Sequence, residues 1–261
     1  MMLQALLVAA SVAATAPVFQ PPPEASIHAP WSALLSAHVE HGLVDYDAFA
    51  KSTEFPKYLN SLATARLEAM TKDERLAFWI NVYNAYTIAL INKHKERESI
   101  RNINMFLGVV KGKGPWKEDI VRAAGRTLTL DEVEHKIIRV EFKEPRIHMA
   151  LVCAAMSCPP LRTEAYEGAR LNEQLKDQTR TFLRDRQMEN RLDLGNSILH
   201  LSPIFDWYRE DFGKTDAAIR RFVAPYFDGA GEKNAFSDSR LKIEFTEYDW
   251  SLNLRRPRVT Q

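Results

Sequence analysis

Thr71-Lys-Asp-Glu-Arg-Leu-Ala-Phe-Trp-Ile-Asn-Val-Tyr-Asn-Ala-Tyr-Thr-Ile-Ala-Leu-Ile91 is the stretch that decides the fold. It opens with Thr71 and Glu74 at the spacing of a capping box, in which each side chain satisfies a free backbone N–H group at a helix start. From Phe78 to Ile91 the helical pattern is apolar on nearly every side. A helix of this kind is stable only when other elements surround it. We therefore expect it at the centre of the protein, with Trp79 and Ile80 buried.

Along the chain, the patterns predict helices in the first half and then strands interspersed with helices. Helices are predicted for Trp31–His41, for a stretch that ends before Leu67, from a second capping box at Thr129–Glu132 to about Val140, for Asn172–Arg184 and for most of Ser202–Tyr226. Strands are predicted for Arg146–Cys153, for Leu192–Leu194 and Ile198–Leu201 around a tight Gly195-Asn196 turn, and for Leu241–Phe245, whereas Asn102–Lys117 is expected to be a loop.

This order predicts an α+β fold, because neighbouring strands are close enough in sequence for antiparallel pairing. We expect a single domain in which a helix-rich N-terminal half packs on a small antiparallel sheet that includes residues 146–153. A papain- or transglutaminase-like arrangement is one option within this class.

Composition excludes several classes of protein. Of the 261 residues, 46% are hydrophobic and 26% are charged, which is typical of a globular protein and not of a disordered chain. The net charge is +1 with acids and bases interleaved, so the basic stripe required for nucleic-acid binding is missing. We predict no nucleic-acid partner and no cofactor.

The N-terminus carries an apolar run, Leu3–Ala16, with no charged residue before Gln20. The run is too short to span a bilayer, and no later segment is long and apolar enough to do so. Small residues at Val12-Ala13-Ala14 favour a signal peptide over residues 1–16, although a basic start is missing. We therefore expect a periplasmic or secreted protein, with a Pro-rich spacer at 17–30, a domain at 31–255 and a tail at 256–261. The alternative is a frayed N-terminus of a cytosolic protein.

Chemistry is concentrated in Arg146–Pro160, which holds both cysteines and His148. Cys153 points to the opposite face of the predicted strand from His148, whereas Cys158 lies past its end, where the chain can turn back. Cys158 is therefore the better nucleophile, since a thiol needs a nearby imidazole to ionise. A Cys153–Cys158 disulfide, two unreactive buried thiols and a metal site remain open alternatives. The metal site is the weakest of these, because no His-x-x-x-His or Cys-x-x-Cys spacing exists.

The central helix carries polar residues on one face, among them Asn81 and Asn84. A buried amide costs about 1–3 kcal/mol unless it finds hydrogen-bond partners. One interpretation is structural, with these amides tying the helix to loops that lack ladders of their own. In the other interpretation Asn84 orients a substrate or a catalytic imidazole.

Glu134 lies within the apolar stripe of the helix that follows Thr129, and His135 lies at the edge of that stripe. A partly buried carboxylate needs a cationic or donor partner. An ion pair with Arg139 or Arg146 is one interpretation, and an acid–base or orienting role for Glu134 or His135 is the other.

These polar groups come from three separate elements, each at a position where an apolar residue would pack better. Such departures cluster at functional sites. We therefore expect one cleft that brings together the side chains of Asn84, Glu134, His135, His148 and Cys158. Two functions follow. The first is a thiol-dependent hydrolase or acyl transferase acting on a peptide or amide, with Cys158 as nucleophile and His148 as base. The second is a non-catalytic envelope module that binds a peptide or protein through the same cleft.

Several motifs together resemble the family known as domain of unknown function 547. They are Gly42–Tyr46, Phe78–Tyr86, Leu128–His135, Arg146–Cys153 with Ser157–Pro160, Leu201–Tyr208 and Tyr248–Asn253. The Trp-Ile-Asn-x-Tyr-Asn-Ala-Tyr and Ser-Cys-Pro-Pro pieces are the most specific, and the resemblance spans about residues 33–253. It implies a shared domain but no activity, because the family has none that transfers to this chain.

Overall fold

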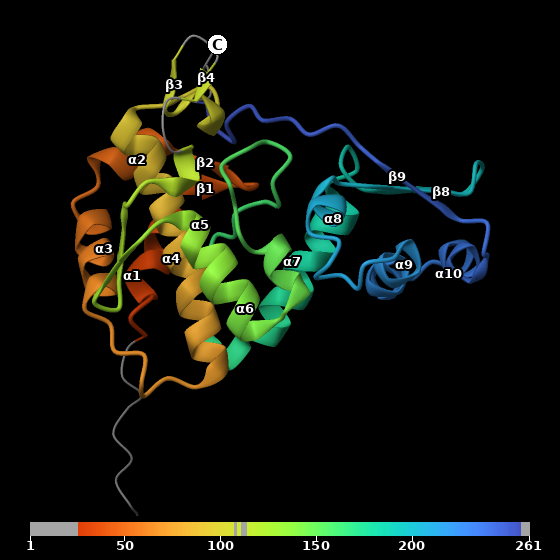
Figure 1. Ribbon diagram of the computed structural model, residues 1–261, viewed down its shortest axis with the longest axis horizontal. Helices are drawn as coiled ribbons and strands as arrows, with labels where there is room; N and C mark the ends of the chain where they lie inside the picture. Colours follow the sequence, from red (N-terminus) through yellow and green to blue (C-terminus); the bar gives the residue numbers. More distant parts are fainter. Residues whose placement is uncertain (1–25, 107–108, 111–113, 257–261) are drawn as a thin grey trace, which may run out of the picture.

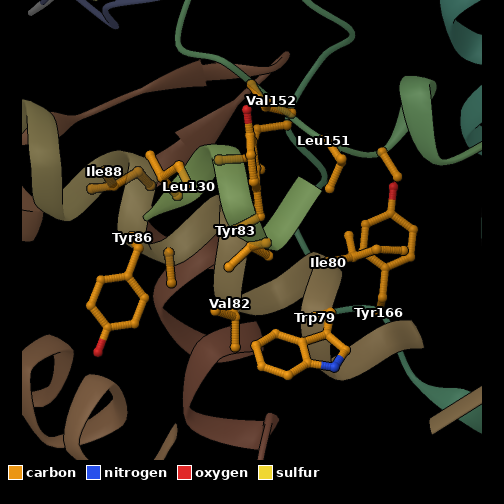
Figure 2. Packing of buried hydrophobic residues seen from close by; sticks show 14 of the residues in the cluster. Trp79, Ile80, Val82, Tyr83, Tyr86, Ile88, Leu130, Leu151, Val152 and Tyr166 are labelled. Atoms are coloured by element: carbon orange, nitrogen blue, oxygen red, sulfur yellow. The ribbon is translucent and has the colours of Figure 1, made fainter. Parts of the chain in front are cut away.

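The central helix is present as α4 (Lys72–His94) in the computed structural model, which describes residues 26–106, 109–110 and 114–256. The capping box of Thr71 and Glu74 begins it, as predicted. Side chains of α4 are buried on several sides, and Trp79 and Ile80 are both buried, which confirms the central position. Figure 2 shows how residues from other elements, such as Leu130 and Tyr166, pack around this helix.

The N-terminal half is built from helices with short antiparallel hairpins between them (Figure 1). The helices are α1 (Ala29–His38), α2 (Tyr46–Lys51) and α3 (Glu54–Ala63). The hairpins are β1 (Val39–Glu40) with β2 (Leu43–Val44), β3 (Met105–Phe106) with β4 (Val109–Val110), and β5 (Val121–Ala123) with β6 (Arg126–Leu128). The stretch at Asn102–Lys117 that was predicted to be a loop contains the β3–β4 hairpin, and short 3-10 turns at Ile100–Asn102 and Pro115–Lys117 lie at its two ends.

The second capping box, Thr129 with Glu132, also forms as predicted. The helix that it begins is not a uniform α-helix. It runs through α5 (Leu130–Glu132), a π-helical turn η3 (Val133–Ile138) and α6 (Arg139–Phe142). A π-helical turn is rare and re-aims side chains, and it is frequent at functional sites.

The predicted strand at Arg146–Cys153 is wrong. Residues Pro145–Met149 form a 3-10 helix, η4, and the chain from Ala150 to Cys153 is irregular. Pro145 occupies the first turn, and the Glu144 side chain accepts a hydrogen bond from the Arg146 N–H group. A short apolar run has no periodicity that separates a buried strand from a buried helical turn.

The C-terminal part forms a second hydrophobic cluster around a three-stranded sheet. It follows α7 (Leu171–Asp185) and contains β7 (Arg191–Asp193), β8 (Ile198–Leu201), α8 (Ile204–Trp207), α9 (Asp216–Val223), α10 (Ala230–Ser237) and β9 (Lys242–Phe245). The predicted hairpin of β7 and β8 is confirmed.

Strand β9, in contrast, pairs with β8 in parallel, not in the antiparallel sense that was expected. Parallel pairing requires a long crossover connection, and residues 202–241 with α8–α10 supply it. The helix-rich composition and the small antiparallel sheets confirm the single-domain α+β class.

The last described segment, residues 246–255, crosses from the second cluster back to the first. We call it the C-terminal strap; Figure 1 shows it in blue. It forms isolated bridges from Leu254 to Val44 and from Leu252 to Ala155. The strap therefore links the end of the chain to its first hairpin.

Some predictions about the chain ends concern residues that the structure does not describe. The signal peptide at 1–16, most of the spacer at 17–30 and nearly all of the tail at 256–261 lie outside the described residues. Helix α1 begins at Ala29, two residues before the expected start of the domain. Among the described residues, no helix is long and apolar enough to cross a bilayer.

Candidate functional site

A cavity of about 220 Å³ lies where the two hydrophobic clusters and the strap meet. Its wall is largely aromatic, with two carboxylates, two imidazoles and both sulfur atoms. The lining residues are Tyr83, Trp116, Asp131, Glu134, His135, His148, Leu151, Cys153, Cys158, Pro159, Ile204, Trp207, Tyr208, Tyr248 and Trp250.

Cys153 and Cys158 form a disulfide in this wall. Of the four alternatives that the sequence left open for the two cysteines, the structure has this one, and neither thiol is free. The hydroxyl of Tyr248 lies 3.3 Å from Sγ of Cys153 and 3.2 Å from Sγ of Cys158. The disulfide and Tyr248 thus form one continuous piece of wall.

The loop between the two cysteines is held by the strap. Met156 and Ser157 donate backbone hydrogen bonds to the carbonyls of Ser251 (2.7 Å) and Asp249 (3.2 Å). The N–H group of Asp249 in turn donates to Oγ of Ser157 at 2.9 Å. These bonds alternate along the two segments like a short ladder, so they fix Tyr248 and Trp250 against the cavity.

His148 lies on η4 and is buried against the ring of Tyr208, with the ring centroids 3.9 Å apart. Its Nε2 atom lies 2.7 Å from Oδ2 of Asp211. Both oxygens of Asp211 also accept hydrogen bonds from Arg139, at 2.6 and 3.0 Å.

The hydrogen bond from His148, together with Arg139, lowers the pKa of Asp211 well below its ordinary value. Burial lowers the pKa of His148. We therefore assign an ionised Asp211 and a neutral imidazole whose Nε2–H group donates to it, since an ionised carboxylate only accepts. Sequence reasoning did not select Asp211, because it lies 63 residues away from its partner.

Glu134 and His135 lie next to each other on the π-helical turn. Glu134 interacts with the hydroxyls of Tyr83 and Tyr208, and burial, together with this carboxylate, raises the pKa of both phenols. Nδ1 of His135 lies 3.0 Å from Nη1 of Arg139. A guanidinium has only donors, so this imidazole nitrogen accepts.

The ion pairs suggested for Glu134 are wrong. Arg139 pairs with Asp211 and Arg146 pairs with Glu144, at 2.6 and 2.7 Å. Neither guanidinium is left for Glu134, because a carboxylate distant in sequence binds Arg139 and a carboxylate two residues earlier in the chain binds Arg146.

Asn84 does not line the cavity. Its Nδ2 donates to the carbonyl of Ala150 and its Oδ1 accepts from the N–H group of Val152, both at 2.9 Å. One turn earlier, Asn81 binds both backbone groups of Tyr166 in the same way, at 2.8 and 3.0 Å. The side-chain amides of Asn81 and Asn84 thus make hydrogen bonds to backbone groups that a neighbouring strand would otherwise make. Asn84 thus acts through the segment that presents Leu151 to the cavity.

Four of the five selected residues, Glu134, His135, His148 and Cys158, therefore line one cavity, and Asn84 supports its wall from behind. The sequence had a signal for the residues that were missed. Asp206-Trp207-Tyr208 and Tyr248-Asp249-Trp250 each combine an acid with two large aromatic residues outside a core pattern. Their rings meet in the structure, with Trp207 4.8 Å from Tyr248 and 5.7 Å from Trp250 between ring centroids.

Among the described residues, no three His, Cys, Asp or Glu side chains are grouped so that they could hold a metal ion. Residues 67–183 match the model of the family described as "Protein of unknown function, DUF547". This match covers part of the span 33–253 over which the motifs resemble that family. No curated protein and no solved structure matches the chain. The matched segment carries the central helix, the π-helical turn, the disulfide and most of α7, so the similarity to the DUF547 family lies in this part of the chain.

Proposed function

We propose that the chain is a ligand-binding module whose aromatic cavity receives a side chain of a peptide or partner protein. The observation that carries this proposal is the disulfide, which commits both sulfur atoms to the cavity wall. With no free thiol, the wall offers apolar rings and a few polar groups, which is the usual composition of a binding site. Its volume of about 220 Å³ is that of a side chain, not of a large ligand.

The rim of the cavity also supports a binding role. Trp207 is 49% exposed although it stacks on Trp250, and it lies at the edge of the cavity. A large exposed indole beside a concave site is typical of a residue that a partner covers, because Trp contributes strongly to binding when it is desolvated.

Calorimetric titration with acetylated, amidated tripeptides Ala-Xaa-Ala, where Xaa is each of the twenty residues in turn, tests this proposal. We expect saturable binding of a subset of them. Trp207→Ala should weaken that binding about tenfold or more, because it removes about 1.4 kcal/mol or more of contact free energy. Met188→Ala is the matched control, since Met188 is 84% exposed and lies outside the cavity. The proposal fails if no tripeptide binds, or if the Trp207→Ala variant binds as tightly as the wild type.

A thiol-dependent hydrolase or acyl transferase acting on a peptide or amide is the second candidate, because Cys158 and His148 line the same cavity. This reaction first needs an external dithiol, whose two electrons and two protons turn the disulfide into two thiols. The Cys158 thiol then gives its proton to the imidazole, and the thiolate attacks the amide carbonyl. The amine leaves with that proton, and water or another acceptor cleaves the thioester. Asp211 would hold the imidazole, as an orienting acid does in other hydrolases.

Alkylation by iodoacetamide, followed by mass spectrometry, separates the two candidates. Protein that has not been reduced should take up no label if the disulfide is intact. After reduction, fast and selective labelling of Cys158 that slows in a His148→Gln variant would favour the enzyme. Equal, slow labelling of Cys153 and Cys158 in both proteins would favour the binding module.

We also propose that the protein is exported to the periplasm or secreted. The apolar Leu3–Ala16 run and the Cys153–Cys158 disulfide support this, since disulfides persist in oxidising compartments. Fusion of residues 1–30 to alkaline phosphatase, which is active only after export, provides the test. An active fusion is expected, and an inactive one that stays in the cytosol would contradict the proposal.

A further inference from the structure

We propose that the aromatic cavity selects the positively charged side chain of Lys or Arg in a peptide, with the Glu134 carboxylate as its counter-ion. This inference rests on the proposed binding function. It starts from the burial of Glu134, which keeps only 7% of its surface exposed and lines the cavity. Among the described residues, no ion pair includes Glu134. A buried carboxylate without a cation is costly unless a partner supplies one.

Arg139 does not fill this role, although it lies close enough for the charge of Glu134 to affect it. Its guanidinium donates two hydrogen bonds to Asp211, at 2.6 and 3.0 Å, and a third to His135. Its charge is therefore matched by Asp211. The hydroxyls of Tyr83 and Tyr208 also contact Glu134, but they are neutral, so the negative charge of this carboxylate is left for a cationic ligand to match.

The other polar groups in the wall add negative charge. Asp131 is a second carboxylate in the lining. His135 accepts from Arg139 through Nδ1, and His148 is held neutral by burial. The described lining therefore holds the two carboxylates of Asp131 and Glu134 and no Lys or Arg side chain, while Arg139 is matched by Asp211 behind it. A cationic group therefore gains electrostatic free energy on entering, whereas an anionic group loses it.

The aromatic walls suit the rest of such a side chain. The faces of Trp and Tyr rings attract cations, and their apolar surface packs against methylene groups. A guanidinium already lies over two rings of this wall. The central guanidinium carbon of Arg101 is 5.4 Å from the centroid of Trp250, and that of Arg139 is 5.1 Å from the centroid of Tyr208. The volume of about 220 Å³ admits one long side chain. A Lys or Arg side chain fits these three conditions: apolar stem, cationic head and single-residue size.

The experiment compares four acetylated, amidated tripeptides by calorimetry: Ala-Xaa-Ala with Lys, Arg, norleucine or Glu in the centre. Norleucine keeps the apolar stem of Lys and lacks the ammonium group. We expect the Lys or the Arg peptide to bind at least about tenfold more tightly than the norleucine peptide, and the Glu peptide to bind most weakly. In E134Q the advantage of the cationic peptide should fall below about threefold, while the affinity for norleucine is kept. Glu173→Gln, at an exposed position of α7 outside the cavity, should keep the tenfold advantage.

The possible results separate the cation inference from the proposed binding function. Equal affinity for the Lys, Arg and norleucine peptides overturns the cation inference and leaves the binding function intact. Tighter binding of the Glu peptide also overturns the inference. Failure of all four peptides to bind, together with the rest of the tripeptide panel, overturns the binding function itself. If E134Q does not fold, the comparison of cationic and norleucine peptides on the wild-type protein still decides.

Discussion

His148 and Asp211 are joined by a hydrogen bond of 2.7 Å between Nε2 and a carboxylate oxygen, across 63 residues of sequence. His148 belongs to the wall of the cavity, and Asp211 follows α8 in the second hydrophobic cluster. Arg139 completes the group by binding Asp211 from the end of the π-helical turn. One carboxylate thus fixes an imidazole and a guanidinium that come from two different elements.

Asp211→Asn should lower the free energy of unfolding by about 1.5–3 kcal/mol, because hydrogen bonds to a charged group are lost on a side chain that is only 26% exposed. Urea denaturation at pH 7 measures this. The matched control is Asp216→Asn, which removes a pair with Arg209 on a carboxylate that is 57% exposed and should change stability by less than about 1 kcal/mol. Equal effects of the two variants would contradict a special role for Asp211.

Reduction of the disulfide should lower the free energy of unfolding by about 2 kcal/mol, the loop-entropy contribution for a closed loop of six residues. Urea denaturation with and without a phosphine reductant measures the difference. A Cys153→Ser/Cys158→Ser double variant should not respond to the reductant. An unchanged unfolding curve, with both thiols alkylated before reduction, would show that the disulfide does not form.

Asn84→Leu should destabilise the protein by about 2–5 kcal/mol, since it leaves the buried carbonyl of Ala150 and the N–H group of Val152 without partners. Thermal or urea unfolding gives the value. Asn60→Leu, at an exposed position of α3, should change stability by no more than about 0.5 kcal/mol. An Asn84→Leu variant as stable as the wild type would contradict a stabilising role for these two hydrogen bonds.

His28 should make the protein less stable in mild acid. Burial lowers its pKa from 6.5 to about 4, and its Nδ1 lies 2.8 Å from the hydroxyl of Tyr58. Between these two pKa values the unfolded chain binds a proton that the folded chain does not. Stability contributed by His28 is therefore complete above pH 6.5 and is lost as the pH falls toward 4, by about 3 kcal/mol at most.

Urea denaturation between pH 7.5 and 4.5 tests this slope, within which other groups also contribute. His28→Gln should flatten it, whereas His41→Asn, at an exposed position with positive φ that Asn tolerates, should leave it unchanged. The same steep slope in His28→Gln and the wild type would contradict the assignment.

Local signals in the sequence predicted the elements that depend on neighbouring residues. The capping boxes at Thr71 and Thr129, the all-round apolar helix and the hairpin at Gly195-Asn196 all involve contacts within a few residues. The strand predicted at 146–153 was wrong because the carbonyl of Ala150 and the N–H group of Val152 bind the side chain of Asn84 on another element, not a neighbouring strand. Periodicity alone cannot reveal such a partner.

The candidate site was predicted only in part for a similar reason. Glu134, His135, His148 and Cys158 stood out because each breaks a local pattern. Asp211 has no such local signal, because its partner His148 lies 63 residues away in sequence. Tyr248 lies in an aromatic motif, but its contact with the disulfide arises only when the strap reaches the cavity. The π-helical turn that re-aims Glu134 has no sequence signature that separates it from a regular helix.

The most direct test of the central claim, that the aromatic cavity binds a peptide side chain, uses the five tryptophans as reporters. Trp116, Trp207 and Trp250 line the cavity, whereas Trp31 and Trp79 are buried in the core. In protein labelled with ¹⁵N at tryptophan, titration with acetylated, amidated Ala-Lys-Ala should shift the indole N–H signals of the three cavity residues saturably and leave the two core signals in place. Five unchanged signals at saturating peptide, or shifts at Trp31 and Trp79 alone, would contradict the account.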